Sequence, residues 1–424
     1  MTAIYPTSPA KALTDQEIIQ FCQQELGGKL DRQRVLVLVP DQTRSLPLHE
    51  LFAAVVQALE GAAALDVMVA LGTHPPLSRS QMDRLLGLTA VNRSFPLLEI
   101  RCFNHDYQRH PELIKVGEIP PELIRTLAGD CWHPSLDQVV PITINRKIME
   151  YDQLLILGPV FPHEVVGFSG GAKYLFPGIS GSEMIDVTHW LGALVGVQKT
   201  IGRKYTAARR MITEAASAVP VPVKYLAPVV VEEGLAGLFY GDHLPTWEEA
   251  AELSAEKHIL VCEQKYRQVL SQAPVMYDEL WTAAKAMYKV ESIVADGGKL
   301  ILYAPHLDQI SGAHGKYLEK IGYHVMPYFL EQWEQFAGVP LAILAHSTHL
   351  KGAGTYQDGK EEPRIEVVLS TRIPEEVCRK LNLGYLDPET VNPASWEGKE
   401  SEGRRYIPRA GETLYLDKTL RQKD

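Results

Sequence analysis

Charged or imidazole side chains follow three predicted β-strands, at the point where each strand ends. The first strand is followed by Asp41-Gln42-Thr43-Arg44, the second by Gly72-Thr73-His74 and the third by His163. Because ligands bind beyond the carboxyl ends of the strands in a parallel sheet, we expect these groups at one edge of the fold. Arginine offers a planar fork for a carboxylate or phosphate, and imidazole transfers protons near pH 7. Together the three segments predict a functional site, although Arg44 taken alone would be read as a surface salt bridge.

A glycine-rich segment follows His163. Its five glycines fall within 15 residues: Gly167, Gly170, Gly171, Gly178 and Gly181. Glycine at this density lets the backbone approach a ligand closely and point N–H groups at an anion, and Lys173 would add a positive charge. The pattern matches neither the Walker loop nor the dinucleotide-binding fingerprint. By itself it favours phosphate binding and a plain glycine-rich turn about equally.

Histidines next to loops are candidate metal ligands or proton carriers. His74, His163 and His189 are the strongest, because neutral imidazole binds nickel, zinc, copper or iron. A three-histidine zinc site of a hydrolase is therefore a competing hypothesis, although the sequence offers no evident Asp or Glu base at the right spacing. His105, His346 and His349 are further candidates, for which we expect a structural or peripheral role.

Strands and helices alternate along the chain, which favours an α/β fold with mainly parallel sheets. We expect strands at residues 35–39, 66–71, 154–157, 227–231 and 299–304, the last of them after a Gly297-Gly298 turn. Helices are expected at residues 49–59, 78–86 and 277–287, with Ser78 as a cap. Residues 324–327 and 341–345 belong to further short apolar pieces, and residues 352–364 to a polar loop.

Length and composition set the remaining expectations. A chain of 424 residues predicts two domains, placed at residues 1–260 and 261–424, with the active site in the cleft between them. The net charge of −10 speaks against a protein that binds nucleic acid by neutralising phosphates. Five widely spaced cysteines, no signal pattern and no apolar run of membrane-spanning length predict a soluble cytoplasmic protein without a membrane partner.

The order and spacing of these motifs resemble the nickel-dependent lactate racemase family. The shared features begin with D-x-T-R at residues 41–44 and a histidine at the end of a predicted strand, in residues 72–74. They continue with H-x(3)-G-F-S-G-G-x-K at 163–173, P-G-I at 177–179 and a histidine at 189, sixteen residues after the lysine. The block G-F-S-G-G-x-K-x(3)-P-G-I is specific, and weaker similarity extends through most of the chain.

This resemblance implies a nickel-pincer nucleotide, a pyridinium bisthiocarboxylic acid mononucleotide that holds nickel. His189 would complete the nickel coordination, Lys173 would anchor the pincer, and cofactor-biosynthesis proteins would deliver it. Further cofactor contacts are implied for Asp41, Thr43, Gly167, Ser169, Gly170 and Gly171. Substrate contacts are implied for Arg44, Trp281, Thr282, Lys285 and Trp333.

The implied reaction is inversion of C2 in a 2-hydroxy acid by reversible hydride transfer to the pincer. His74 and His163 match the family pair of bases, and each would remove the hydroxyl proton of one enantiomer. The planar keto acid would then be reduced on its other face, while domain closure excludes water.

The predicted substrate wall departs from the family pattern. Trp281 and Thr282 stand where the type enzyme has tyrosine and glutamine, and residues 346–364 also differ. A longer hydroxylated acid, such as a sugar acid, is therefore an alternative to lactate, and its inversion would be an epimerisation. A non-catalytic nucleotide-binding or cofactor-storage protein is a third hypothesis, which the pair His74 and His163 disfavours.

Overall fold

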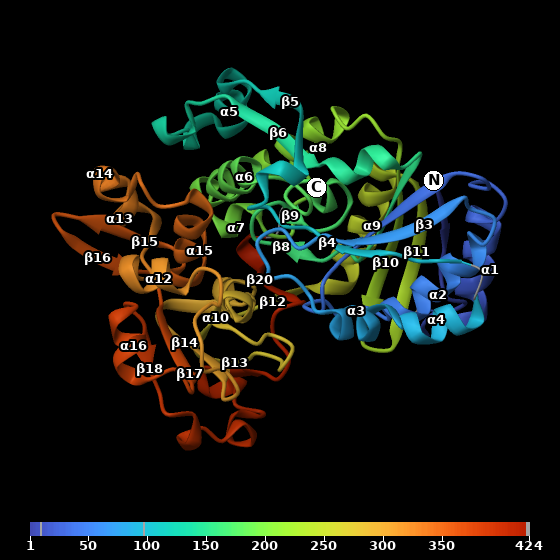
Figure 1. Cartoon of the computed structure of the whole chain (residues 1–424). Helices are drawn as coiled ribbons and strands as arrows, with labels where there is room; N and C mark the ends of the chain where they lie inside the picture. Colours follow the sequence, from blue (N-terminus) through green and yellow to red (C-terminus); the bar gives the residue numbers. More distant parts are fainter. Residues whose placement is uncertain (9–10, 96–97, 421–424) are drawn as a thin grey trace.

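The first part of the chain forms a seven-stranded, mainly parallel sheet, seen on the right of Figure 1. The computed structural model describes residues 1–8, 11–95 and 98–420. The strands lie in the spatial order β1 (Thr2–Ile4), β11 (Gly234–Asp242), β10 (Val223–Val231), β7 (Gln153–Leu157), β2 (Arg34–Val39), β3 (Ala64–Val69) and β4 (Cys102–Asn104). The strands from β10 to β4 are parallel, whereas β11 and β1 add an antiparallel edge. The four strands predicted in this part are confirmed as β2, β3, β7 and β10.

The central strands are buried on both faces, which explains their continuous apolar runs. In β2, Val35, Val37 and Val39 pack into one core, and Leu36 and Leu38 pack into another. Helices α1 (Asp15–Leu26) and α2 (Leu48–Ala58) cover the first of these faces, and α9 (His243–His258) packs on β10 and β11 at the other. The helix predicted at residues 49–59 is thus confirmed as α2.

The cap predicted for the next helix is also confirmed. Ser78 precedes α3 (Arg79–Leu86), and its hydroxyl accepts a hydrogen bond from the Gln81 N–H at 3.3 Å. The Gln81 side chain accepts one from the Ser78 N–H at 2.8 Å, which completes a capping box. The helix stops at Gly87, whose φ of +63° is left-handed.

The second part of the chain forms a five-stranded sheet that is parallel throughout. Its order is β18 (Gly384–Tyr385), β17 (Glu366–Thr371), β14 (Val294–Ala304), β13 (Tyr266–Gln272) and β19 (Arg404–Ile407). The α/β class with mainly parallel sheets is thereby confirmed. This partition of the strands supports the division into residues 1–260 and 261–424, which stays a prediction and includes residues outside the described ranges.

Three expectations in the second part need correction. The helix predicted at residues 277–287 starts later and is two short helices, α10 (Leu280–Ala283) and α11 (Lys285–Tyr288). The Gly297-Gly298 turn does not precede the strand but lies inside β14, where the register with β13 shifts. The loop at residues 352–364 contains a hairpin of β15 (Gly354–Gln357) and β16 (Lys360–Pro363), which turns at Asp358 and Gly359 with φ of +53° and +78°.

Helix α15 (Leu341–Lys351) contains the apolar piece at residues 341–345. All of its residues after Leu341 are buried, so it has no polar face that could give a helical period in the sequence. It packs against α6 (Ser182–Val195) of the first part. The Asp186 carboxylate on α6 accepts a hydrogen bond from the Ala342 N–H at 2.9 Å, at the start of α15. This contact holds α15 of the second part beside α6 of the first part (Figure 1).

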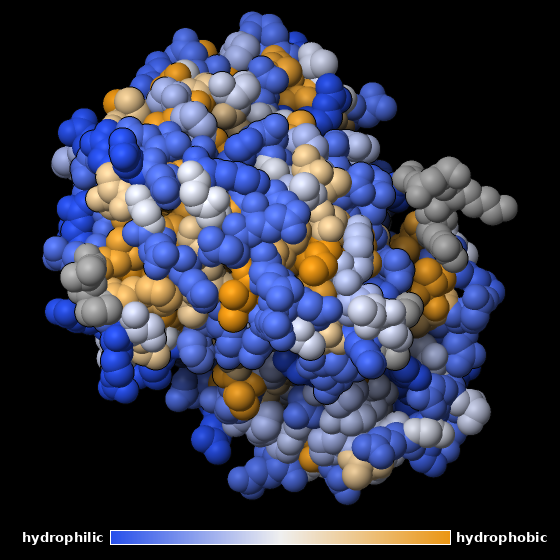
Figure 2. Space-filling model, turned by 90° about the vertical axis from the view of Figure 1, so that its right-hand side faces the viewer, coloured by the Kyte–Doolittle hydropathy of each residue, from blue (hydrophilic) through white to orange (hydrophobic). Residues whose placement is uncertain are grey.

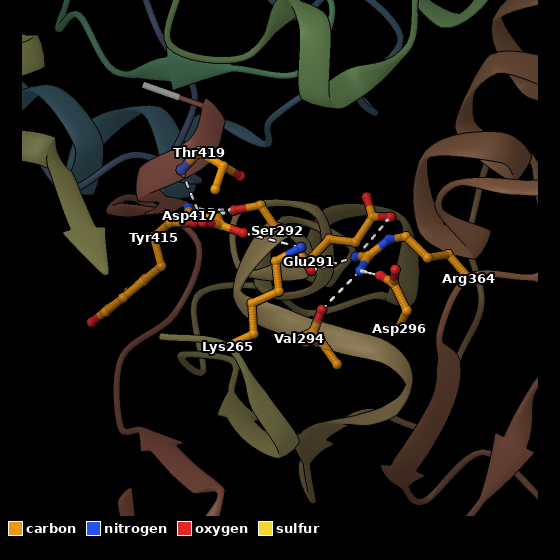
Figure 3. Close-up of polar contacts among 9 residues, drawn as sticks. All are labelled: Lys265, Glu291, Ser292, Val294, Asp296, Arg364, Tyr415, Asp417 and Thr419. Carbon is orange, nitrogen blue, oxygen red and sulfur yellow. Dashed lines mark hydrogen bonds and ion pairs between the residues drawn. The ribbon is translucent and has the colours of Figure 1, made fainter. Parts of the chain in front are cut away.

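A polar network ties the end of the chain to the second sheet (Figure 3). Strand β20 (Leu414–Asp417) pairs in parallel with β12 (Ile259–Cys262), which follows α9. Asp417 forms an ion pair with Lys265 at 3.0 Å, and its N–H donates to the Ser292 hydroxyl. Next to it, Arg364 at the foot of the hairpin donates to Glu291 and Val294. The strand that begins the second part and the strand that closes it therefore lie side by side.

The outer surface is predominantly hydrophilic in the view of Figure 2, with hydrophobic side chains in small groups. Within the described residues, no helix combines the length and the apolar character needed to cross a bilayer.

Candidate functional site

One cavity is lined by side chains from both parts of the chain. From the first part it takes Asp41, Arg44, His74, His163, Ser169, Gly170, Lys173 and His189. From the second part it takes Trp281, Thr282, Lys285, His346 and His349. Most of the predicted site residues therefore meet at one place. Thr43, Gly167, Gly171 and Trp333 are the predicted residues that do not line it.

Asp41 organises the loop after β2. Its Oδ1 atom accepts hydrogen bonds from the Thr43 N–H at 3.0 Å and the Thr43 hydroxyl at 2.7 Å. Its Oδ2 atom pairs with His74 Nδ1. Burial alone would raise the pKa of Asp41, but His74 and Arg44 outweigh it and hold the pKa below its ordinary value. With Nδ1 engaged by a carboxylate, His74 presents Nε2 for proton transfer.

Arg44 and the β3 loop complete this corner of the cavity. Arg44 Nη1 donates to the Thr43 carbonyl at 2.9 Å and the Thr43 hydroxyl at 2.7 Å, so Thr43 supports both Asp41 and Arg44 from behind. Gly72 adopts a left-handed φ of +57°, and its N–H donates to the Gly178 carbonyl at 3.0 Å. This bond fixes the loop that carries His74 against the glycine-rich segment.

His163 is paired with a carboxylate that the sequence analysis missed. It lies in β8 (Pro162–His163), and its Nδ1 atom is 3.4 Å from Glu164 Oε2 and accepts from the Val165 N–H at 3.1 Å. Burial lowers the pKa of the His163 imidazole well below its ordinary value, although Glu164 opposes that shift. Burial would raise the pKa of Glu164, but His163 and His349 keep it low, so Glu164 is an anion. Adjacency to His163 was the only signal for this role.

Lys173 and His189 face the cavity, where His189 is uncharged near neutral pH and Lys173 is still mostly protonated. Burial, reinforced by Arg44, lowers the pKa of Lys173 to about 8. Burial and the nearby Lys173 lower the pKa of His189 to about 4. On α6, His189 Nδ1 donates to the Ile185 carbonyl at 2.6 Å, which leaves Nε2 as the lone-pair nitrogen. Metal-binding histidines are oriented in this way by a backbone carbonyl.

The glycine-rich loop is held from behind by buried side chains. Arg209 on α8 (Ala207–Ser217) donates to the Phe168 carbonyl and, at 3.1 Å, to the Gly170 carbonyl. Trp247 Nε1 donates to the Ser169 carbonyl at 2.8 Å. A Cβ atom on Gly167 would lie 1.8 Å from the Arg203 carbonyl oxygen, and one on Gly171 would lie 3.0 Å from the Trp247 side chain. These two glycines therefore serve close packing against protein, and Gly170 alone of the three borders the cavity.

The wall from the second part is less completely hydrogen-bonded. Lys285 Nζ is buried 4.7 Å above the Tyr277 ring and has no hydrogen-bond partner within the described residues. Burial lowers its pKa well below the ordinary value. The Thr282 hydroxyl donates to the Glu279 carbonyl at 3.0 Å, and Trp281 stacks on His346 at 3.8 Å.

Trp333 lies outside the cavity, where its ring packs near Trp190 of α6 and His133. His346 and His349, by contrast, line the cavity. Their position is therefore not peripheral, because a buried helix that the sequence did not reveal brings them to the cavity, whereas the structural role expected for them stays a prediction. His105 is buried and pairs with the Ser180 carbonyl at 2.9 Å, as a structural residue would.

The histidines do not assemble into a conventional metal site. Across residues 1–8, 11–95 and 98–420, no group of three or more His, Cys, Asp or Glu side chains is arranged to hold a metal ion. This counts against the three-histidine zinc hypothesis.

Parts of the chain are similar in sequence to known proteins. Residues 18–124 and 135–202 match the lactate racemase N-terminal domain family. The lactate racemase of Lactiplantibacillus plantarum is 22% identical over 66% of this chain and 62% of its own length. That of Thermoanaerobacterium thermosaccharolyticum is 24% identical over 37% of this chain and 32% of its own length. The chain thus spans less than two thirds of the length of the curated relatives it matches.

Two solved structures share the fold over nearly the whole chain. A protein from Thermotoga maritima superposes with a TM-score of 0.88 at 29% identity, covering 96% of this chain and 99% of its own. The lactate racemase apoprotein from Thermoanaerobacterium thermosaccharolyticum superposes with a TM-score of 0.70 at 16% identity, covering 96% and 94%.

Proposed function

We propose that this chain, which carries the lactate racemase N-terminal domain in its first part, is an isomerase that inverts C2 of a 2-hydroxy acid with a nickel-pincer nucleotide. The observation that carries the proposal is the pairing of two histidines with carboxylates around one cavity. His74 has Asp41 at Nδ1, and His163 has Glu164. A racemase needs one proton carrier for each face of its substrate, and these two pairs supply them.

The residues present suit the proposed cofactor. His189 offers one neutral imidazole nitrogen, and imidazole is a good ligand for nickel. Lys173 offers an amine with a pKa of about 8, which favours a covalent or ionic link at neutral pH. The loop around Ser169 and Gly170 borders the same cavity, next to the cations Arg44 and Lys173. When bound, the cofactor would accept hydride from C2 of the substrate and return it.

Side chains of the protein would bind the substrate and transfer its hydroxyl proton. Arg44 binds the substrate carboxylate through its guanidinium group, while Thr43 holds its Nη1 atom. Lys285 approaches from the second part, and a carboxylate beside it would favour the charged ammonium. His74 Nε2 takes the hydroxyl proton of one enantiomer. His163 does so for the other, and the nearby Glu164 carboxylate favours the protonated imidazole that results.

A zinc-dependent hydrolase is disfavoured by the lack of a three-ligand metal group in the described residues. A sugar-acid epimerase with the same chemistry is the second candidate, because Trp281 and Thr282 alter the predicted substrate wall. Cytoplasmic location and delivery of the cofactor by its biosynthesis proteins belong to the proposal.

The proposal is tested by producing the protein in cells that make the pincer cofactor and in matched cells that do not. Only the first preparation should contain nickel, absorb visible light and abolish the optical rotation of a pure 2-hydroxy acid enantiomer. One equivalent of zinc, with neither nickel nor a chromophore in either preparation, would overturn it.

A further inference from the structure

We propose that α15 contributes a neutral hydrogen-bonding subsite in which His346 and His349 bind an additional hydroxyl group of the substrate. The inference rests on the proposed function and narrows it. The substrate class becomes 2-hydroxy acids with at least one further hydroxyl on the carbon chain, rather than acids with an apolar or a second acidic end.

His346 has a ring nitrogen that no group in the described part of the chain hydrogen-bonds. Its ring is 8% exposed and stacks on Trp281 at 3.8 Å with an interplanar angle of 6°. Its Nε2 atom lies 3.0 Å from the Trp281 carbonyl oxygen and must therefore carry the proton. The Nδ1 atom is then the lone-pair nitrogen, and it is buried with no partner within the described residues.

His349 lies one helical turn further along, on the same face of α15. It is 3% exposed, and its Nε2 atom is also buried without a hydrogen-bond partner in the part of the chain that the structure describes. Buried polar atoms without partners cost free energy that a ligand can recover. Because both residues line the cavity, a group that donates to one ring and accepts from the other would satisfy both. A hydroxyl group does this, whereas a methyl group and a carboxylate do not.

The charges around the cavity also favour a hydroxyl. Burial lowers the pKa of His346 to about 3 and that of His349 to about 4, so both rings are neutral at pH 7. The Glu164 carboxylate lies close enough to interact electrostatically with both rings and would repel a second anion. The basic side chains that line the cavity, Arg44, Lys173 and Lys285, already serve the first carboxylate and the cofactor in the proposed function.

The subsite is held rigidly in place. Helix α15 is buried along its length, and its first turn is tied to α6 by the bond between Asp186 and Ala342. The same α6 carries His189, so the distance between the proposed metal ligand and the two histidines of α15 is set by direct helix packing.

The test compares lactate, glycerate and malate, which differ in a methyl, a hydroxymethyl and a carboxymethyl group. With the cofactor-loaded enzyme, we expect kcat/KM to be highest for glycerate. In His349→Phe and His346→Phe, which keep a ring in place, kcat/KM for glycerate should fall about tenfold while that for lactate changes less than about twofold. His314→Phe is the matched control, because His314 packs on Trp281 from outside the cavity and should change both substrates equally.

Equal losses for lactate and glycerate in the α15 variants, or a preference for malate in the native enzyme, would overturn the inference. A second measurement does not depend on turnover. Calorimetric titration of the protein as purified should give tighter binding of glycerate than of lactate, and His349→Phe should remove that difference. If no acid is inverted and no nickel is retained, the proposed function fails, while the calorimetric difference still tests the subsite.

Discussion

The two walls of the cavity differ in how far the protein itself satisfies their polar groups. In the first wall, Asp41, Arg44, His74, His163 and His189 all have hydrogen bonds or ion pairs to protein. In the second wall, Lys285 Nζ, His346 Nδ1 and His349 Nε2 are buried without partners within the described residues. The first wall is therefore preorganised, as proton transfer and metal binding require. The second wall has polar atoms left for a ligand.

The largest effect should come from removing the proposed metal ligand of the first wall. In His189→Ala we expect nickel content to fall to background and activity to fall about a thousandfold or more, because the chemistry depends on the cofactor. His74→Ala should lose activity but keep nickel. Metal analysis of both variants distinguishes the roles, and equal loss of nickel from the two would contradict the assignment.

Asp41→Asn tests the preorganisation of the first wall itself. The amide cannot stabilise a protonated His74 or enforce its tautomer, so kcat should fall by roughly 10²–10⁴ with little change in KM. Asp66→Asn is the matched control, because Asp66 is also buried but pairs with Arg101 and Tyr151 away from the cavity. That control should lose stability on urea unfolding and keep its kcat. A lower kcat in both variants would mean that Asp41 is merely structural.

Lys285→Met should separate function from stability in the second wall. Without the ammonium partner, KM should rise by about tenfold or more, while kcat changes less. Because the native amine is buried without a partner, the free energy of unfolding of the ligand-free protein should rise by about 1 kcal/mol or more. Thermal unfolding without substrate checks the sign, and a clear decrease in stability would show that Lys285 has a protein partner in solution.

The smallest expected effect concerns the reactivity of Lys173, and its measurement does not require an active enzyme. Because the pKa of Lys173 is about 8, acylation of this residue in the ligand-free protein should reach half its maximal rate near pH 8. Peptide mass spectrometry measures the rate of acylation at Lys173. The unfolded chain holds this proton up to about 10.5, so the contribution of Lys173 to stability becomes more favourable as the pH rises from about 8 to 10.5. A midpoint near 10.5 in the folded protein would show that the cavity does not desolvate the amine.

The first wall could be predicted from the sequence because its residues lie in short motifs. Asp41, His74 and His163 each follow a strand with a clear apolar run, and the capping box at Ser78 is local in the chain. Glu164 was missed because a carboxylate next to a histidine carries no spacing signal. Its role depends on burial that only the folded chain creates.

The second wall was predicted less well for a related reason. Its residues lie on short helices, and α15 is buried on every side, so no periodicity marks its inward face. Arg209 and Trp247, which support the glycine-rich loop, are far from it in sequence and were also missed. Gly167 and Gly171 fit the expected anion nest by pattern, yet their environment in the folded protein is backbone and ring packing.

The pairing of β12 with β20 has a consequence for protein engineering. Ile259 and Leu414 are register partners, so the strand that leads into the second part pairs with a strand near its far end. The second part can therefore be exchanged between relatives through a junction placed before Ile259, which takes β12 and β20 from the same parent. Such chimeras would combine one cofactor pocket with the substrate walls of different relatives, and selectivity could be varied without rebuilding the chemistry.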